Sequence, residues 1–324
     1  MKAWVCERFS SPFELVQKEL PIPEPDSGEV RLRVRAAGLS FGETLVLEGA
    51  YQKLPQLPYI PCSEMSGVVD AVGSGTSGLT KGDRVAAFSV SLAGGGLAEY
   101  CVLSENFVHR IADEVDLVDA AGILMNNWTA FNALYRRARL SPGETLVVFG
   151  ASGGAGGAAL CMGKALGARV IAVGSDMGSL SPSNTDEFID YRAGNVYEKV
   201  RQLTNGRGAD VYFDPVGGEM FDQAMRAIAP GGRILVVGFT SGKPASVRTN
   251  VALVKMISII GVEGRLAIEQ TGVQGGNDFH MMLEWINQGK IGSQPSIRYG
   301  FSDALEAFRD LRNRQAKGKL IVEI

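Results

Sequence analysis

A glycine-rich turn at residues 150–156 constrains the fold of this chain more than any other feature. It follows the apolar run Thr145 to Phe149 directly and opens a segment rich in small residues, Ala155 to Leu166, which ends at Gly167. The apolar run is typical of a buried parallel strand, and Gly167 stands where a helix C-cap is expected. Strand, turn and helix in this order predict the first βα unit of a doubly wound α/β sheet.

The turn also predicts a phosphate site, because glycines let backbone N–H groups and the positive end of a helix approach a pyrophosphate. Gly150, Gly153 and Gly156 have the spacing G-x-x-G-x-x-G, which differs from the common G-x-G-x-x-G. A turn that merely packs a helix onto a strand is the alternative, and the strand–turn–helix order favours phosphate binding over it. The turn residues expected at a dinucleotide are Gly150, Ser152, Gly153, Gly154 and Ala155.

The rest of the chain has two kinds of sequence pattern, one in each half. From residue 1 to about 126 it has short β-rich runs, of which Glu29 to Arg35 alternates charged and apolar residues as a half-buried antiparallel strand does. This half is predicted to be a β-barrel or sandwich. A helix is expected over 129–138, and then apolar runs at 145–149, 169–173, 209–213 and 233–237 alternate with helix-like segments. This alternation predicts βαβ units.

After about residue 264 the pattern changes to two amphipathic helices, at 278–288 and 302–314, and a terminal strand at 319–324. A lone terminal strand needs a sheet to join, so we place this tail on the N-terminal domain. The predicted domains are 1–127 with 265–324, and 128–264.

Composition narrows the class of partner. The net charge of −3 without a long basic run argues against nucleic-acid binding. Four scattered cysteines with no C-x-x-C pair support neither a disulfide framework nor a cysteine zinc site. The N-terminus lacks a signal-peptide core, and the strongest apolar run, 251–262, is broken by Lys255. We expect a cytoplasmic protein that acts on small molecules and does not enter a membrane.

The end of the second predicted strand bears on the choice of cofactor. An acidic residue there binds the ribose 2′-hydroxyl of NADH and repels a 2′-phosphate. Gly174 and Ser175 follow the strand, and Asp176 lies beyond the expected position. This favours NADPH, and an Asp176 that turns in to select NADH is the alternative.

Motifs along nearly the whole chain resemble those of the zinc-independent quinone oxidoreductases of the medium-chain dehydrogenase/reductase superfamily. Their order and spacing carry the resemblance. They are Gly82 to Val85, Gly95 to Tyr100, Trp128 to Ala130, Ser141 to Glu144, Gly150 to Gly156, Ile189 to Arg192, Asp214 to Gly218 and Val237 to Phe239.

This resemblance implies a GroES-like catalytic domain, a Rossmann domain, a nicotinamide cleft between them, NADPH as reductant and often a homodimer. By position it places Thr129 near the nicotinamide, Gly153 to Ala155 at the pyrophosphate, and Gly238 and Phe239 at the carboxamide. Around the adenosine 2′-phosphate it places Gly174, Ser175, Tyr191 and Arg314.

The chain departs from the family in two loops. Gly178 stands where a lysine usually grips the 2′-phosphate, which leaves Arg314 and Arg192 as candidates for that charge, with a solvated surface arginine as the alternative for each. Where the family commonly has an asparagine and an aspartate, this chain has Ser40 to Thr44. We expect Glu43 in this loop to cap or brace a helix rather than to catalyse.

No metal site is expected. The positions of the zinc ligands in related alcohol dehydrogenases have Ser40 to Gly42 and Cys62 to Glu64 here, and His109 and His280 have no partner at metal spacing. Without a metal, the acceptor is expected to be a quinone or a conjugated carbonyl, which spreads the incoming charge to an oxygen.

Tyr51 is the first candidate to protonate that oxygen, and Ser40 and Asn127 are weaker ones. A pocket-wall role for Tyr51 is equally compatible with the sequence, because solvent can supply the proton. The chain is therefore interpreted as an NADPH-dependent quinone reductase. An enoyl or alkenal reductase and a non-catalytic NADPH-binding protein are the alternatives, and residues 251–262 are expected to form an edge strand at a dimer axis.

Overall fold

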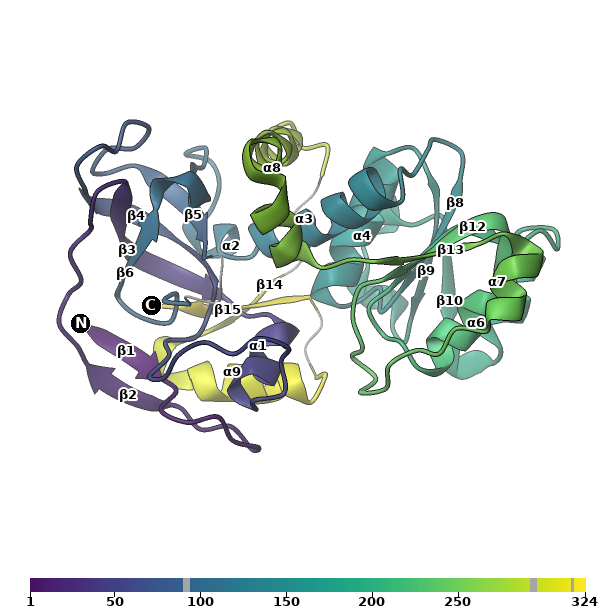
Figure 1. Ribbon diagram of the computed structural model, residues 1–324, viewed down its shortest axis with the longest axis horizontal. Helices are drawn as coiled ribbons and strands as arrows, with labels where there is room; N and C mark the ends of the chain where they lie inside the picture. The colour runs from purple at the N-terminus through teal and green to yellow at the C-terminus, as the bar shows by residue number, and fades with distance from the viewer. Residues whose placement is uncertain (90–93, 292–295, 316–317) are drawn as a thin grey trace. The chain divides into compact units, whose positions relative to one another are not determined.

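The computed structural model describes residues 1–89, 94–291, 296–315 and 318–324. It contains two compact units (Figure 1). The first combines Met1–Met125 with Pro295–Ile324, and the second is Asn126–Gln294.

The first unit is built mainly from antiparallel strands. Its largest sheet has the order β14-β15-β3-β4-β5-β7, with β6 also paired to β3, and β1 and β2 form a separate pair. The strands are β1 (Lys2–Val5), β2 (Val16–Glu19), β3 (Glu29–Gly38), β4 (Glu64–Val72), β5 (Arg84–Phe88), β6 (Tyr100–Ser104), β7 (Val108–Arg110), β14 (Ser296–Tyr299) and β15 (Lys319–Glu323). The helices are α1 (Phe41–Leu47), α2 (Leu117–Ala120) and α9 (Ala304–Arg312).

The C-terminal strand joins strands from the N-terminal part of the chain in this sheet. Val30, Leu32 and Val34 of β3 enter the core while the residues between them stay more exposed, as the alternating pattern predicts. β15 pairs antiparallel with β3, with Ile321 opposite Gly38, so the terminal strand joins the N-terminal sheet as expected. Helices α1 and α9, which lie far apart in the sequence, pack side by side (Figure 1).

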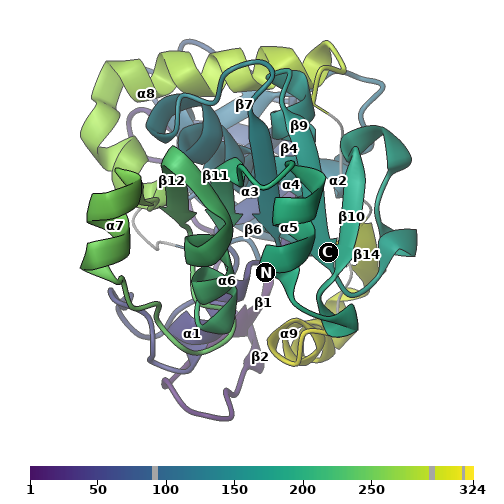
Figure 2. The same ribbon diagram turned by 90° about the vertical axis from the view of Figure 1, so that its right-hand side faces the viewer.

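The second unit has a six-stranded parallel sheet of order β10-β9-β8-β11-β12-β13. This is the 3-2-1-4-5-6 order of a Rossmann fold and confirms the predicted doubly wound sheet. Its strands are β8 (Thr145–Phe149), β9 (Arg169–Gly174), β10 (Glu187–Asp190), β11 (Ala209–Asp214), β12 (Ile228–Val236) and β13 (Ser258–Gly261). Its helices are α4 (Gly154–Ala165), α5 (Val196–Leu203), α6 (Glu219–Ala227), α7 (Thr249–Lys255) and α8 (Gly264–Asn287). Figure 2 shows β10 and α7 on opposite sides of this unit.

Both faces of the sheet are buried. Val147 and Phe149 pack in a cluster with residues of α5 and α6, whereas Leu146 meets Gly163 of α4 on the opposite face. Each of the three side chains is 0% exposed, which explains why β8 is a continuous apolar run.

Helix α3 (Leu124–Ala130) begins in the first unit and ends in the second. The sequence pattern places this helix at 129–138, but it starts five residues earlier and becomes a π-helix at Phe131–Arg137. The carbonyl of Ala133 accepts the N–H of Ala138, which is the i→i+5 bond of that geometry.

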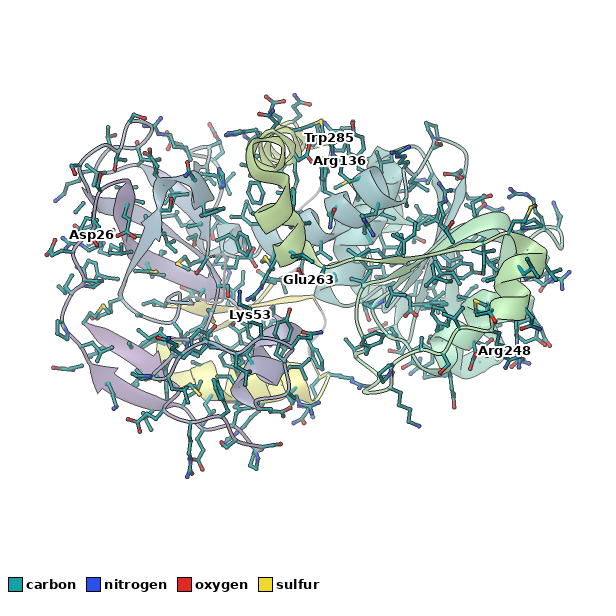
Figure 3. The ribbon with its side chains drawn as sticks, in the orientation of Figure 1. Asp26, Lys53, Arg136, Arg248, Glu263 and Trp285 are labelled. Atoms are coloured by element: carbon teal, nitrogen blue, oxygen red, sulfur yellow. The ribbon has the colours of Figure 1, made fainter. Side chains whose placement is uncertain are left out.

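The predicted boundary at residue 265 is wrong, because α8 belongs to the second unit. Asp278 of α8 forms an ion pair with Arg136, and Trp285 makes edge contacts with Phe131 and Tyr135. Arg136 and Trp285 are labelled beside α8 in Figure 3. α8 also starts at Gly264, well before the predicted residue 278, and the carboxylate of Glu263 caps it by accepting the N–H of Leu266.

The expected edge strand over 251–262 is also only partly correct. Thr249–Lys255 is helix α7, and only Ser258–Gly261 is a strand. Met256, with φ 53°, ends the helix in the left-handed region, and the chain turns there into β13. Within the described ranges, no helix has the length and apolar character needed to cross a bilayer.

Candidate functional site

The carboxyl ends of parallel strands collect the predicted cofactor residues at one edge of the second unit's sheet. Because β8, β9, β11 and β12 all run the same way, the loops that follow them share this edge. The N–H of Ala151 donates to the carbonyl of Val173 at 3.1 Å, and the N–H of Val237 donates to that of Asp214 at 2.9 Å. These bonds tie the four loops together in pairs.

The glycine turn has the geometry that a dinucleotide requires. Gly150 has φ +60°, and Gly153 is the N-cap of α4. A Cβ on Gly156 would lie 2.1 Å from the carbonyl oxygen of Gly150, so only glycine lets the helix start this close to the strand. The first-turn N–H groups of a helix have no acceptor within the helix, and they are available to a phosphate.

Asn126 supports the same turn and was missed by the sequence analysis. A Cβ on Gly154 would lie 2.5 Å from the side-chain nitrogen of Asn126, so this amide packs directly on the glycine. Asn126 is the third residue of α3. The sequence carries no signal for this contact, because the two residues meet only in the folded chain.

Around the end of β9 the structure gathers Ser152, Gly174 and Ser175. The Ser152 hydroxyl oxygen lies 4.0 Å from the position of a Cβ on Gly174. Asp176 is the N-cap of the following 3₁₀ turn, where its carboxylate accepts the N–H of Gly178 at 2.9 Å. The carboxylate that would select NADH is therefore engaged in capping this turn.

The side chain of Arg192 places a positive charge beside Ser175, at the end of β9. Together with the exposed Tyr191 it lies in the 3₁₀ turn that follows β10, and its guanidinium binds the carboxylate of Asp190 at 2.8 and 3.0 Å. The guanidinium also donates to the carbonyl of Ser175. Its hydrogen bonds lower the pKa of Asp190 to about 2. Arg314, the other candidate, follows α9 in the first unit with φ 58°.

The loops after β11 and β12 pack on each other. The Asp214 carboxylate, 1% exposed, accepts the N–H groups of Val216 and Gly217, both at 2.8 Å. Burial raises the pKa of Asp214. A Cβ on Gly217 would lie 2.9 Å from the ring of Phe239, so the loop after β11 packs directly against Gly238 and Phe239. In the sequence, the residues of this loop were noted only as the motif Asp214 to Gly218, one of those that carry the family resemblance.

In the first unit, Ser40 and Tyr51 lie around Gly42. A Cβ on Gly42 would be 3.5 Å from the Tyr51 ring and 4.0 Å from the Ser40 hydroxyl oxygen. Ser40 immediately precedes α1, and Tyr51 is half-buried beside the core.

The remaining predicted residues, Asn127 and Thr129, lie on α3. Asn127 is 4% exposed. The Thr129 hydroxyl oxygen lies 3.5 Å from the position of a Cβ on Gly264.

Glu43 braces a loop, whereas the sequence suggested that it would cap or brace a helix. It is 1% exposed, and its carboxylate accepts the N–H of Cys62 at 2.9 Å and that of Ser63 at 2.6 Å. Burial and the nearby Glu43 carboxylate raise the pKa of the Cys62 thiol well above its usual value, so a thiolate is disfavoured there.

His109 lies in β7 and His280 in α8. In the part of the chain that the structure describes, no three His, Cys, Asp or Glu side chains are grouped as a metal ion would require.

Comparison with known proteins places the chain among the dehydrogenases and reductases. Residues 26–113 match the alcohol dehydrogenase GroES-like domain, and residues 184–322 match a family described as zinc-binding dehydrogenase. The chain is 32% identical to a quinone oxidoreductase-like protein 2 homolog from Nematostella vectensis over 99% of its length and 88% of the relative.

Solved structures agree with this placement. A quinone oxidoreductase from Pseudomonas syringae superposes with a TM-score of 0.88 at 27% identity, covering 100% of this chain and 99% of that one. A mycobacterial protein solved in complex with NADPH has the same TM-score and identity and covers 100% of both chains. The chain therefore belongs to the quinone oxidoreductase family of the medium-chain dehydrogenase/reductase superfamily.

Proposed function

We propose that this protein is an NADPH-dependent quinone reductase. The observation that carries the proposal is the turn from Gly150 to Gly156, where strand, backbone turn and helix N-terminus leave room for a pyrophosphate and where a Cβ on Gly156 would meet the backbone. Gly153, Gly154 and Ala155 would hold the pyrophosphate, and Gly238 and Phe239 the carboxamide.

The preference for NADPH rests on the end of β9. Ser175 and Arg192 supply a hydroxyl and a guanidinium where the 2′-phosphate of the cofactor is expected, and Arg192 is already held there by Asp190. Asp176 caps its own turn, and the proposal assigns it no contact with the ribose. Tyr191 and Arg314 complete the proposed set.

The proposed acceptor is a quinone. NADPH supplies a hydride when it is bound, and the residues of this chain orient both partners and exclude water. The hydroxyls of Tyr51 and Ser40 and the amide of Asn127 are the proposed hydrogen-bond donors to the developing oxyanion.

A direct, metal-free transfer fits the chemistry of the donors in the first unit. Ser40 and Ser63 are hydroxyls rather than thiolate or imidazole ligands, the Cys62 thiol stays protonated, and the Glu43 carboxylate is engaged with two backbone N–H groups.

Oxidation of NADPH, followed at its absorbance band against a panel of acceptors, tests this function. We expect turnover of 1,4-benzoquinone and 9,10-phenanthrenequinone. Turnover of crotonyl-CoA or an alkenal without turnover of either quinone would instead assign the protein as a double-bond reductase. Tight NADPH binding with no turnover of any acceptor would make it a non-catalytic binding protein.

We also infer a homodimer. β13 is the outer strand of the six-stranded sheet, and the neighbouring Leu253, Val254 and Met256 are 78%, 79% and 74% exposed. An unpaired strand edge beside an exposed apolar patch favours pairing with a second copy.

A further inference from the structure

A buried ion pair in the first unit joins the C-terminal strand to a helix of the proposed site. The Lys319 ammonium of β15 lies 2.5 Å from the Glu64 carboxylate of β4, and the two side chains are 4% and 2% exposed. Neither residue is among the cofactor-binding residues or proton donors proposed above.

The second carboxylate oxygen of Glu64 caps helix α3. It accepts the N–H of Leu124 at 2.7 Å and the N–H of Met125 at 3.1 Å, which are the first two residues of that helix. These N–H groups have no acceptor within the helix, so Glu64 of strand β4 acts as the N-terminal cap of helix α3.

The lysine reaches Glu64 through a slot formed by two glycines. A Cβ on Gly38 would lie 2.9 Å from Cε of Lys319, and a Cβ on Gly122 would lie 2.7 Å from its Cγ. The slot therefore fits a long unbranched side chain.

A fully buried ion pair adds little net stability over two apolar side chains of similar size, because removing both charges from water costs about as much as their attraction returns. Stability alone does not account for the pair. Its geometry does, because Lys319 holds one oxygen of Glu64 and thereby aims the other at the start of α3.

We propose that Glu64 and Lys319 are positioning residues for the cofactor site, an inference that rests on the proposed NADPH binding. The helix that they fix carries Asn126, whose amide packs on Gly154 of the glycine turn, and Thr129, which is expected at the nicotinamide. A frayed first turn of α3 would loosen Asn126 and weaken NADPH binding.

Two double variants separate positioning from stability. In E64Q/K319M the glutamine oxygen still accepts the N–H groups of Leu124 and Met125, whereas E64L/K319M removes the cap. Both variants eliminate the charges, and methionine keeps an unbranched chain in the glycine slot. The NADPH Kd is measured by titration calorimetry at a temperature where thermal scans show both variants folded.

We expect E64L/K319M to bind NADPH about fivefold more weakly than E64Q/K319M, which keeps an affinity close to that of the wild type. Equal affinities in the two variants would overturn the proposal, whether both match the wild type or both are weakened. Hydrogen exchange at residues 124–130 gives a readout without cofactor, and we expect faster exchange in E64L/K319M alone.

This second measurement separates the two possible failures. Wild-type protein that binds no NADPH would refute the proposed function, and exchange would still decide whether Glu64 fixes α3. Equal exchange in both variants would remove the positioning role, whatever the cofactor.

Discussion

The guanidinium of Arg192 donates a hydrogen bond to the backbone carbonyl of Ser175, which links the ends of two adjacent strands. Asp190 holds the same guanidinium by two further contacts, at 2.8 and 3.0 Å. Arg192 is 61% exposed on its side chain, so it is positioned and still open to solvent. Gly178 stands where the resemblance leads us to expect a lysine, and Arg192 supplies a positive charge beside Ser175.

Arg192→Gln is expected to weaken NADPH binding about tenfold and to leave NADH binding unchanged, because only NADPH carries the 2′-phosphate that a guanidinium binds. Titration calorimetry with both cofactors measures the two affinities. Gly178→Lys should shift the preference further towards NADPH.

Arg207→Gln is the matched control. Arg207 also pairs with an aspartate, Asp210, and is 59% exposed, but it lies before β11, at the opposite end of the strands from Ser175. An NADPH-to-NADH affinity ratio that Arg192→Gln leaves unchanged would remove Arg192 from the 2′-phosphate site.

Tyr51→Phe is expected to lower kcat for quinone reduction about tenfold, which is less than the roughly 10²-fold or more of a typical general acid because solvent can also protonate the product. The NADPH Kd should not change. Stopped-flow rates and a cofactor titration on the same preparation check both points. Tyr100→Phe, a phenol on β6 of the same unit, serves as control. An unchanged kcat would leave Tyr51 as a wall of the pocket.

Gly156→Ala is expected to abolish NADPH binding at working concentrations and to lower the Tm. The added Cβ would stand 2.1 Å from the carbonyl oxygen of Gly150, and no side-chain rotation relieves a clash with backbone. Overpacking of this kind costs about 1–3 kcal/mol. Gly78→Ala, where a Cβ has nothing within 4 Å, is the control in thermal scans and cofactor titrations. Wild-type affinity in Gly156→Ala would show that the turn has room for a Cβ at residue 156.

The sequence predicts the second unit well because buried parallel strands are continuous apolar runs. Four of the six strands follow from such runs, and β8 matches at both ends. β12 begins at Ile228, five residues before its predicted start, because Pro230 and the two glycines after it interrupt the pattern. The assignment of α8 failed for a different reason: its partners Phe131 and Arg136 are distant in the sequence, and local periodicity carries no information about them.

The residues of the candidate site also fall into those that the sequence predicted and those that it did not. Gly150 and Gly156 were predicted because backbone geometry demands glycine at those positions. Asn126, Glu64 and Lys319 were not, because their roles depend on which segments meet in the fold.

The outer position of β13 predicts association. We expect sedimentation equilibrium to give twice the chain mass of 34.5 kDa. Leu253→Glu with Met256→Glu should shift the protein towards monomer, because two charges would be buried in the proposed interface. Val16→Glu, at an exposed position of β2 in the first unit, is the control. A wild-type protein that sediments as a monomer would refute the dimer.

Asp214 gives a prediction about pH. Burial raises its pKa in the folded protein, so the folded state holds the proton more tightly than the unfolded state does. The stability contributed by this group is complete below the unfolded pKa of about 3.9 and is lost as the pH rises through the raised folded value.

Asp214→Asn keeps an oxygen acceptor for the N–H groups of Val216 and Gly217 and removes the charge. Its free energy of unfolding should therefore rise relative to that of the wild type as the pH increases from about 4 to 7. Asp214→Ala leaves both N–H groups without this acceptor and should be about 1–3 kcal/mol less stable than Asp214→Asn at every pH. Urea denaturation across this range measures all three proteins. A difference between Asp214→Asn and wild type that does not change with pH would show that burial does not control this carboxyl.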